Sequence, residues 1–535
     1  MAAAQSPDLR ISSKKGSGNT VENSNLRKQF KKEGDVMMKR ILNPILPSWE
    51  YVADGEPHVF GDRVYLFGSH DAFNGRSFCP LDYVLWSAPL RDLSDWRKEG
   101  VIYRTQQDPQ AKRNSFMQAP DVIRGTDGRF YLYYTLSLDP TMSVAVSDTI
   151  TGPYEYYGRV KDITGHVIGS SRGDLFQFDP GLFRDDDGRI YLYSGFGPNY
   201  SGILGYIVSR YQMHGGYVME LGEDMLTVTS GPNLVLPRQG EAQTGSFAGH
   251  EFYEASSMRK IGGKYYWIYS SVLSHELCYA VSDHPDRDFR FGGTIISIGN
   301  VGWHGQQKAD NYTGNTHGSL VCIEGQWYIF YHRQTNGNMF SRQACAEPVQ
   351  IRPDGTICQV QTTSCGLAGT VMDAEGEFPA GCACTLQSPE GTLMYTRHRA
   401  RALKKHPYIT QSGKDREENP DQYIANMSDG CSAGFRYLKM KGPGRIAVQL
   451  NSGKKAEGTM RVSAVQRDGT GERELAVIPV CAGKERRWFE TRLAEEDGDM
   501  ELRFTWNGSG TVSFYTFRIS GESVVDNGKG EGYEK

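Results

Sequence analysis

One hydrophobic pattern recurs five times along the first two thirds of the chain. Each copy opens on a turn that contains glycine and continues into a short, tyrosine-rich apolar run. The copies read "GDRVYLFGSHD", "DGRFYLYYTL", "DGRIYLYSGF", "GGKYYWIYSS" and "EGQWYIFYHR". Such turns suit a hairpin, and aromatic and β-branched residues favour strands. The pattern therefore predicts five β-hairpins.

The copies recur at a nearly constant interval. Their matching tyrosines are Tyr65, Tyr131, Tyr191, Tyr266 and Tyr328, which lie 66, 60, 75 and 62 residues apart. Common propeller blades span roughly 40–50 residues, and longer loops would account for the excess. Radial closure lets such blades hide their edges. We therefore expect a five-bladed β-propeller over residues 36–355. A generic all-β protein with many hairpins is the alternative, which the regular recurrence disfavours.

The rest of the chain predicts a second β domain. Residues 356–405 are rich in Cys, Gly and Thr, and we expect them to form a connector packed on the propeller. Alternating runs such as "GRIAVQL" and "GTMRVSAVQ" predict a β-sandwich over residues 406–520. Residues 1–35 are predicted to be a flexible polar segment and residues 521–535 a loose tail. The predicted fold class is all-β, a five-bladed propeller followed by a sandwich.

Composition narrows the range of partners. The 59 basic and 63 acidic residues give a net charge of −4, which offers no reason to expect nucleic acid or a membrane surface as a partner. No apolar run approaches the roughly 18 residues of a membrane span. The N-terminus lacks the apolar core of a secretory signal, which predicts a cytoplasmic protein whose ten cysteines are free thiols. Nothing in the sequence indicates an oligomeric state.

Each of the five units also carries an ionisable residue ten to twelve positions before its tyrosine. These residues are Asp54, Asp121, Asp179, Glu254 and His317. Equivalent positions in radially repeated blades lie at equal radius, so we expect these side chains to gather at one end of the central channel. Clustered carboxylates repel one another and usually have a function. The alternative is that Asp before Pro or Gly only forms a turn, and it weighs most for Asp179 in "DPG".

Paired carboxyl groups suggest acid–base chemistry. Glycoside hydrolysis uses one protonated carboxyl to donate to the leaving oxygen and one carboxylate to activate water. A third acid nearby raises the pKa of the donor by like-charge repulsion. Calcium binding is the other use of clustered carboxylates, although the chain contains no EF-hand or HExxH motif.

The motifs around these residues resemble glycoside hydrolase family 43. The resemblance covers about residues 40–350 and is carried by "ADGEPHVFGDRVYLFGSHD", "QAPDVIRGTDGRFYLYYT", "FDPGLFRDDDGRIYLYSGFG", "FYEASSMRKIGGKYYWIYS" and "HGSLVCIEGQWYIFYHR". It implies a five-bladed propeller and an inverting, mostly pentose-releasing enzyme. Matched residue by residue, it implies that Asp54 is the general base, Asp121 the acid that tunes the pKa of the donor, and Glu254 the general acid.

The resemblance implies two further site residues and leaves two rivals. His317 matches a histidine beneath the pocket that is sometimes linked to a central calcium, so the resemblance implies a substrate-binding residue and a possible ligand of a structural calcium ion, although no cofactor is required. Arg342 in "FSRQACAEP" matches an arginine near the sugar. Glu56 in "DGEP" is a rival to Asp54 because the two share a face of a strand. Glu251 is a rival to Glu254, three positions earlier.

The C-terminal stretch "YIANMSDGCSAGFRYLKMKGPG" resembles the opening of carbohydrate-binding module family 6. Together, these features predict an inverting, exo-acting glycoside hydrolase that releases α-L-arabinofuranose or β-D-xylose from hemicellulose or pectin oligosaccharides. A non-catalytic sugar-binding propeller and an endo-acting arabinanase are the alternatives.

Overall fold

The computed structural model describes most of the chain beyond its N-terminal segment. The described residues are 42–198, 209–242, 245–395, 406–417, 421–467, 469 and 471–521. The predicted flexible segment 1–35 and the predicted tail, apart from its first residue, lie outside this set. Within these ranges no helix is long and apolar enough to cross a membrane.

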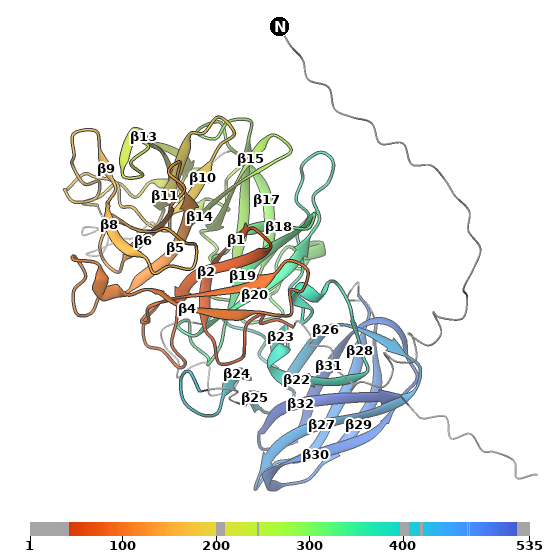
Figure 1. Ribbon diagram of the computed structural model, residues 1–535. Coiled ribbons are helices and arrows are strands. Elements are labelled where there is room, and N and C mark those ends of the chain that lie inside the picture. Colours follow the sequence, from red (N-terminus) through yellow and green to blue (C-terminus); the bar gives the residue numbers. More distant parts are fainter. Residues whose placement is uncertain are drawn as a thin grey trace, which may run out of the picture. The chain divides into compact units, whose positions relative to one another are not determined.

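Five consecutive sheets follow one another between Val52 and Val349 (Figure 1). The first holds β1 (Val52–Phe60), β2 (Arg63–His70), β3 (Tyr83–Pro89) and β4 (Arg97–Tyr103). The second holds β5 (Met117–Arg124), β6 (Phe130–Leu136), β7 (Met142–Ser147) and β8 (Glu155–Arg159). The third holds β10 (Gly181–Arg184), β11 (Ile190–Phe196), β12 (Gly215–Leu221) and β13 (Thr227–Pro237), with the short β9 (Lys161–Asp162) at its outer edge.

The fourth and fifth sheets repeat the antiparallel order. The fourth holds β14 (Phe252–Ile261), β15 (Lys264–Ser271), β16 (Glu276–Ser282) and β17 (Arg290–Ser297). The fifth holds β18 (Leu320–Ile323), β19 (Gln326–Gln334) and β20 (Arg342–Val349). Two 3-10 turns lie in the loops, at Thr105–Gln107 and Trp303–Gly305. Each recurring tyrosine is the second or third residue of the second strand of its blade, as the hairpin pattern predicts.

The first strands of the five sheets form a closed ring. β1 contacts β5, β5 contacts β10, and β10 contacts β14. Arg259 on β14 donates from Nε to the carbonyl of Leu320 on β18 at 2.7 Å, and β18 contacts β1. This closure confirms the predicted five-bladed β-propeller.

The chain ahead of β1 is hydrogen-bonded to β20, the last strand of the fifth blade. The amide of Ile45 donates to the carbonyl of Ala344 at 3.0 Å. The Asn43 side chain donates to the carbonyl of Ala346 at 3.1 Å and to Glu347 Oε1 at 2.8 Å. The stretch from Asn43 to Ile45 therefore acts as a clasp along β20.

Apolar side chains fill the spaces between neighbouring blades. Phe67 and Leu85 of the first sheet pack with Val122 and Leu132 of the second, and all four are buried. Because each blade is covered on both faces, its middle strands are apolar on both faces rather than on one. Burying a side chain of this size contributes roughly 1.5–3 kcal/mol.

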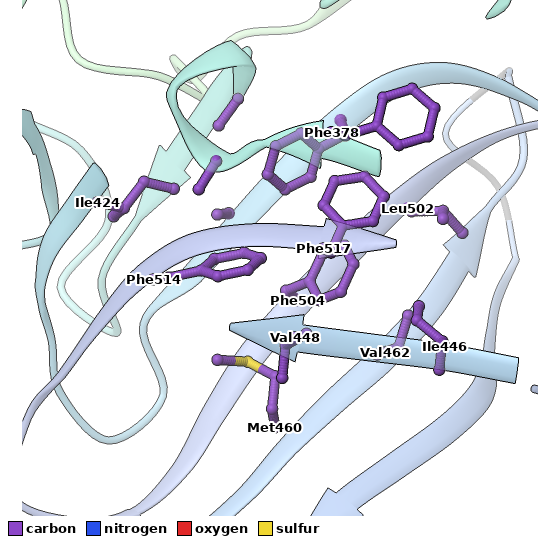
Figure 2. Close-up of a cluster of buried hydrophobic side chains, with 14 of the residues drawn as sticks. Phe378, Ile424, Ile446, Val448, Met460, Val462, Leu502, Phe504, Phe514 and Phe517 are labelled. Atoms are coloured by element: carbon purple, nitrogen blue, oxygen red, sulfur yellow. The ribbon is translucent and has the colours of Figure 1, made fainter. Parts of the chain in front are cut away.

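Two facing sheets form the C-terminal sandwich. One runs β21 (Met372–Asp373), β26 (Ser432–Lys441), β31 (Asp497–Ser509), β28 (Glu457–Val465), β29 (Glu472–Val480), with β23 (Thr385–Gln387) also on β26. The other runs β24 (Tyr408–Gln411), β25 (Gln422–Met427), β32 (Val512–Gly521), β27 (Gly444–Gly453), β30 (Gly483–Leu493), with β22 (Gly376–Pro379) on β32. Figure 2 shows the phenylalanine-rich core between them, where Phe378 stacks on Phe517 at 4.9 Å.

The connector predicted at 356–405 divides between the two domains. Ile357 belongs to the core between the fourth and fifth blades, where it joins Tyr266 and Ile329. From Met372 onward the connector supplies β21, β22 and β23 to the sandwich, after a short 3-10 turn at Gly366–Ala368 and with another at Ala380–Cys382. The connector is thus packed on the propeller at its start and built into the sandwich sheets further on.

This division predicts the effect of truncation. A chain that ends after residue 405 loses β24–β32, so β21–β23 lose their strand partners and Phe378 loses its packing against Phe517. We expect such a chain to be recovered mostly as insoluble protein, because exposed apolar surface of this kind favours aggregation. The soluble fraction after expression checks this. A chain ending at Gly521 keeps every described strand and is the matched control; equal solubility of the two would contradict the prediction.

Candidate active site

A backbone irregularity recurs in four blades, within the first strand or just ahead of it. Asp54 (φ 53°), Ala119 (36°) and Ala255 (71°) lie within β1, β5 and β14, and Asp179 (46°) lies two residues ahead of β10. In three of these strands the ladder also shifts register at this point, between Ala53 and Glu56, Gln118 and Asp121, and Glu254 and Ser257. Such bulges redirect side chains and are common next to functional sites.

Four ionisable side chains from the first, third and fifth blades meet at this end of the ring. Arg342 Nη1 lies 2.7 Å from Asp54 Oδ1. His317 Nδ1 lies 3.5 Å from Asp179 Oδ2 and 3.9 Å from Asp54 Oδ1. All four are at least nine-tenths buried. The prediction that Asp54, Asp179 and His317 converge from separate blades therefore agrees with the geometry.

Glu254 completes this group from the fourth blade. The amide of Ala255, the next residue along β14, donates to Asp179 Oδ2 at 3.1 Å. The charges that act most strongly on Glu254 are those of Asp179, His317, Asp54 and Arg342. Glu254 is half-buried, which leaves its carboxyl reachable by a substrate. We call Asp54, Asp179, Glu254, His317 and Arg342 the central group.

The electrostatics separate the two carboxyl groups on which acid–base chemistry depends. Burial, with a further contribution from the negative charge of Asp179, raises the pKa of Glu254 from 4.5 to about 8. Burial alone would also raise the pKa of Asp54, but the Arg342 guanidinium, the nearby His332 and His317 and a hydrogen bond with Ser69 together outweigh it and lower that pKa to about 2. At neutral pH Glu254 is therefore protonated and Asp54 ionised.

Two histidines near Asp54 differ in charge. Burial opposes the cationic form of His317, but the carboxylates of Asp179 and Asp54 outweigh it and raise its pKa to about 9. His332 is fully buried, and burial together with the charge of Arg342 lowers its pKa to about 3. The Asp54 amide donates to His332 Nδ1 at 3.2 Å, and His332 Nε2 lies 2.9 Å from the Asn315 carbonyl. His332 is thus a neutral support for the backbone of Asp54.

Asp121 requires a correction, because the structure does not bring it to the central group. Its Oδ1 lies 2.7 Å from His58 Nε2, and its Oδ2 accepts from the Leu182 amide at 2.6 Å. In register, the positive-φ residue Ala119 is the counterpart of Asp54 and Asp179, and Asp121 comes two positions later. The place beside Glu254 that we predicted for Asp121 is occupied by Asp179.

The two rival glutamates have other partners. Glu56 Oε1 lies 2.5 Å from Arg259 Nη2 and accepts from Ser257 Oγ at 2.9 Å. This buried ion pair holds the Glu56 carboxylate near Asp121, below the central group. The charge of Glu251 acts on His250 rather than on the central group. Neither glutamate therefore replaces Asp54 or Glu254 in the geometry.

Sequence reasoning missed Asp71, which follows β2 in "GSHD". Its carboxylate accepts from Arg342 Nε at 2.8 Å and from Arg342 Nη2 at 3.1 Å, and its side chain is completely buried. Arg342 is 2% exposed, so its guanidinium bridges Asp71 and Asp54 rather than facing solvent. The signal available in the sequence was an acidic residue directly after an apolar strand, which also describes many ordinary turns.

The surroundings of His317 bear on the predicted calcium ion. His317 Nδ1 is directed at the carboxylates of Asp179 and Asp54, so only its Nε2 atom could face an ion, and a calcium ion there stays a prediction. Among the described residues, Glu56, His58 and Asp121 do place potential ligand atoms within 4.8 Å of one another, but Arg259 already pairs with Glu56. We assign no step to a metal.

A cavity of about 720 Å³ lies beside the central group, at the loop ends of the first, second and fifth blades. Phe78 and Phe340 line it, as does Gln118, which immediately precedes the bulge in β5. The Phe78 ring also lies 4.8 Å from the Arg342 guanidinium. The volume of the cavity is within the range of small-molecule sites, and the cavity adjoins the buried charges of the central group.

Comparison with known proteins gives one consistent family. The model of glycosyl hydrolases family 43 matches residues 41–357. A xylosidase/arabinosidase from Thermoclostridium stercorarium is 45% identical over 488 residues, covering 90% of this chain and 99% of that protein. A xylosidase/arabinosidase from Bacteroides ovatus is 29% identical over 353 residues, covering 60% of this chain and 98% of that protein.

Among solved structures, one similar chain is a β-xylosidase/α-arabinofuranosidase from a compost microbial metagenome in complex with xylotriose. It has a TM-score of 0.47 and 25% identity, and the match covers 60% of this chain and 97% of that chain. The family match coincides with the propeller, and the similarity to the Thermoclostridium protein extends through the sandwich.

Proposed function

Because the chain belongs to glycosyl hydrolase family 43, we propose that it is an inverting, exo-acting enzyme that releases xylose or arabinose from short oligosaccharides. The observation that carries this proposal is the convergence of two carboxyl groups in different surroundings: Asp54 lies 2.7 Å from the Arg342 guanidinium, whereas Glu254 precedes the residue whose amide binds the Asp179 carboxylate. These surroundings favour an ionised Asp54 and a protonated Glu254. The names of the relatives, xylosidase/arabinosidase, support a pentose as the released sugar.

In this proposal Glu254 is the general acid. It donates its proton to the glycosidic oxygen as the bond to the sugar breaks. Asp54 is the general base, and it takes a proton from the water that attacks from the other side of the ring. Their strands, β1 and β14, are not neighbours in the ring, since β18 separates them on one side and β5 and β10 on the other. A gap of roughly 6.5–9.5 Å leaves room for water and gives inversion.

The remaining members of the central group act through these two. Asp179 takes the role of the acid that raises the pKa of Glu254, with His317 paired to it. Arg342 keeps Asp54 ionised and oriented. The reaction needs only the chain's own carboxyl groups and water, so we propose no cofactor.

Turnover of aryl pentosides tests the function. We expect hydrolysis of 4-nitrophenyl β-D-xyloside, 4-nitrophenyl α-L-arabinofuranoside, or both, with the anomeric configuration of the first-formed sugar inverted in proton NMR. Binding without product release would favour a sugar-binding propeller. Release of oligomers from arabinan without free pentose would favour an endo-acting arabinanase, and retention of configuration would overturn the acid–base assignment.

The resemblance of the sandwich to carbohydrate-binding module family 6 stays a proposal. Phe435, Tyr437 and Trp506 are buried and belong to the folded core. The stacked pair of Tyr423 and Tyr515, with ring centroids 4.7 Å apart, is only partly buried, as is Trp488. Sugar binding by the sandwich would depend on such partly exposed aromatic side chains.

The pH profile distinguishes Asp179 from Asp121. A general acid works only while protonated, so the rate falls as pH rises through the pKa of Glu254, about 8. Asp179→Asn removes a negative charge that disfavours ionisation of Glu254, so we expect the basic limb of kcat/KM to move to lower pH. Asp121→Asn is the matched control and should leave that limb in place. A shift in the Asp121 variant alone would restore our first assignment.

A further inference from the structure

The guanidinium of Arg342 is held by one carboxylate and presented to another. Asp71 receives hydrogen bonds from the Arg342 amide at 3.1 Å, from Arg342 Nε at 2.8 Å and Nη2 at 3.1 Å, and from the Cys79 amide at 2.9 Å. The remaining nitrogen, Nη1, donates to Asp54 at 2.7 Å. Because a guanidinium is planar and rigid, the position of Asp71 determines where Nη1 meets Asp54.

The backbone that carries Asp71 is in turn held by the sandwich domain. Arg416 Nη2 donates to the Asp71 carbonyl, and the Phe73 amide donates to Asp415 Oδ1 at 2.8 Å. Arg416 Nη1 also pairs with Asp415 Oδ1 at 2.8 Å. Two neighbouring residues of the C-terminal domain therefore bind both sides of the turn from Asp71 to Phe73.

The segment that carries Arg416 is itself anchored on the propeller. The amide of Asn336 donates to the Ile409 carbonyl at 2.7 Å, and Thr410 Oγ1 donates to Asn336 Oδ1 at 2.6 Å. Tyr51, which is completely buried, donates from its hydroxyl to Gln411 Oε1. Yet β24 (Tyr408–Gln411) pairs with β25 and belongs to a sandwich sheet. The segment thus joins the sandwich to the catalytic end of the propeller.

Arg416, which binds the Asp71 carbonyl, has an uncommon backbone conformation. Its φ is 59°, in the left-handed region that residues other than Gly, Asn and Asp rarely occupy. Such strain persists only where surrounding contacts impose it, and it is frequent at functional positions.

We propose that residues 406–417 of the sandwich are part of the machinery of the catalytic base, with Asp71 and Arg416 as positioning residues that orient Asp54 through Arg342. This inference rests on the proposed function for its catalytic consequence. It assigns the C-terminal domain a role inside the propeller's reaction, in addition to covering apolar surface.

The inference predicts a specific kinetic defect. A loosened Asp71 turn displaces Arg342 from Asp54 and so misplaces the base relative to the attacking water. Misplacement by about 1 Å costs as much as 10²-fold in rate. Neither Arg416 nor Asp415 lines the cavity beside the central group, so their removal deletes no side-chain contact to a sugar there, although residues 74–78, which follow the turn, do line it. The loss should therefore fall on kcat rather than on KM.

The pH dependence supplies a second readout. The charged and titratable groups around Asp54 are Arg342, His332 and His317, the acids Asp71, Asp179 and Glu254, and the buried Cys79 and Tyr83. Asp54 must be ionised to act, so activity falls as pH falls through its pKa. Moving Arg342 away removes the main charge that keeps this pKa low, so the acid limb of kcat/KM should move to higher pH.

The experiment uses the full chain and the variants Arg416→Ala and Asp415→Ala, with Arg473→Ala as control. Arg473 is an exposed sandwich arginine paired with Glu496, so its removal tests surface charge alone. We expect the first two variants to lose about tenfold or more in kcat on aryl pentosides, with KM within twofold, a raised acid limb, and a Tm close to that of the parent. We expect Arg473→Ala to match the parent in all four.

The outcomes separate this inference from the proposed function. Variants with a lowered Tm but parental kcat and acid limb in the folded fraction would reduce the segment to a structural role and overturn the inference. An inactive parent would refute the function instead. In that case amide hydrogen exchange at Asp71 and Phe73 still decides the positioning, since Arg416→Ala should speed it and Arg473→Ala should not. If Arg416→Ala fails to fold, Asp71→Asn replaces it in the test. The inference then requires that the acid limb of kcat/KM in Asp71→Asn moves to higher pH while KM stays at the parental value, and an acid limb at the parental pH would overturn the inference.

Discussion

Glu254→Ala is expected to lose roughly 10²–10⁴-fold in activity on natural oligosaccharides while retaining most of its activity on aryl pentosides with very acidic phenols. A sugar is a poor leaving group and needs the proton that Glu254 supplies. A nitrophenolate leaves without that proton. Plotting kcat/KM against the pKa of the leaving group for the parent and the variant checks this, and the variant should show the much steeper dependence.

The same variant should lose the basic limb of its pH profile on activated substrates. Burial raises the pKa of Glu254 to about 8, and the parent becomes inactive as that carboxyl ionises. Glu251→Ala is the matched control, because it removes the neighbouring glutamate without touching the central group. Equal losses on both leaving-group classes in Glu254→Ala would remove the proton-donor role, and a steep leaving-group dependence in Glu251→Ala would transfer it.

Asp54→Asn is expected to lower activity on every substrate alike, by roughly 10²–10⁴-fold. Asp54 activates water, and water attacks whichever group is leaving, so the defect should not depend on the leaving group. Asparagine also tolerates the positive φ of 53° at this position, so the fold should survive the substitution. Kinetics on natural and activated substrates, together with Tm, measure both expectations.

Glu56 provides the comparison for the base. Glu56→Gln breaks a buried ion pair with Arg259, so we expect a lower Tm but a nearly parental kcat in the folded protein. If the glutamine variant instead lost activity on all substrates while Asp54→Asn stayed active, Glu56 would be the base.

The architecture could be predicted because its signals are local. Turn residues and tyrosine-rich strands repeat in each blade, and each hairpin of the propeller pairs residues close in sequence. Asp54 and Glu254 could be identified for the same reason, since each lies on the first strand of a recognisable hairpin.

The positions of Asp121 and Asp71 could not be read from such signals. A residue that is two positions out of register stays on the same face of a strand, so alternation does not distinguish Asp121 from its counterpart Ala119. Only the bulges, with their positive φ values, fix the level of each side chain. Asp71 acts through Arg342, which is 271 positions away, and contacts over that distance leave no periodic trace in one sequence.

The clasp formed by Asn43 and Ile45 on β20 has a consequence for the order of folding. Asn43 and its partner Ala346 are 303 positions apart, so the ring cannot be locked during synthesis until the fifth blade has emerged. Blades one to four can form earlier from local hairpins. Until the fifth blade is made, however, they form an incomplete ring in which blades one and four each lack a neighbour on one side. Closing so long a loop is entropically slow, and open arcs are exposed to association with one another in the meantime. We therefore expect the late step of refolding to be ring closure, and its yield to fall as protein concentration rises.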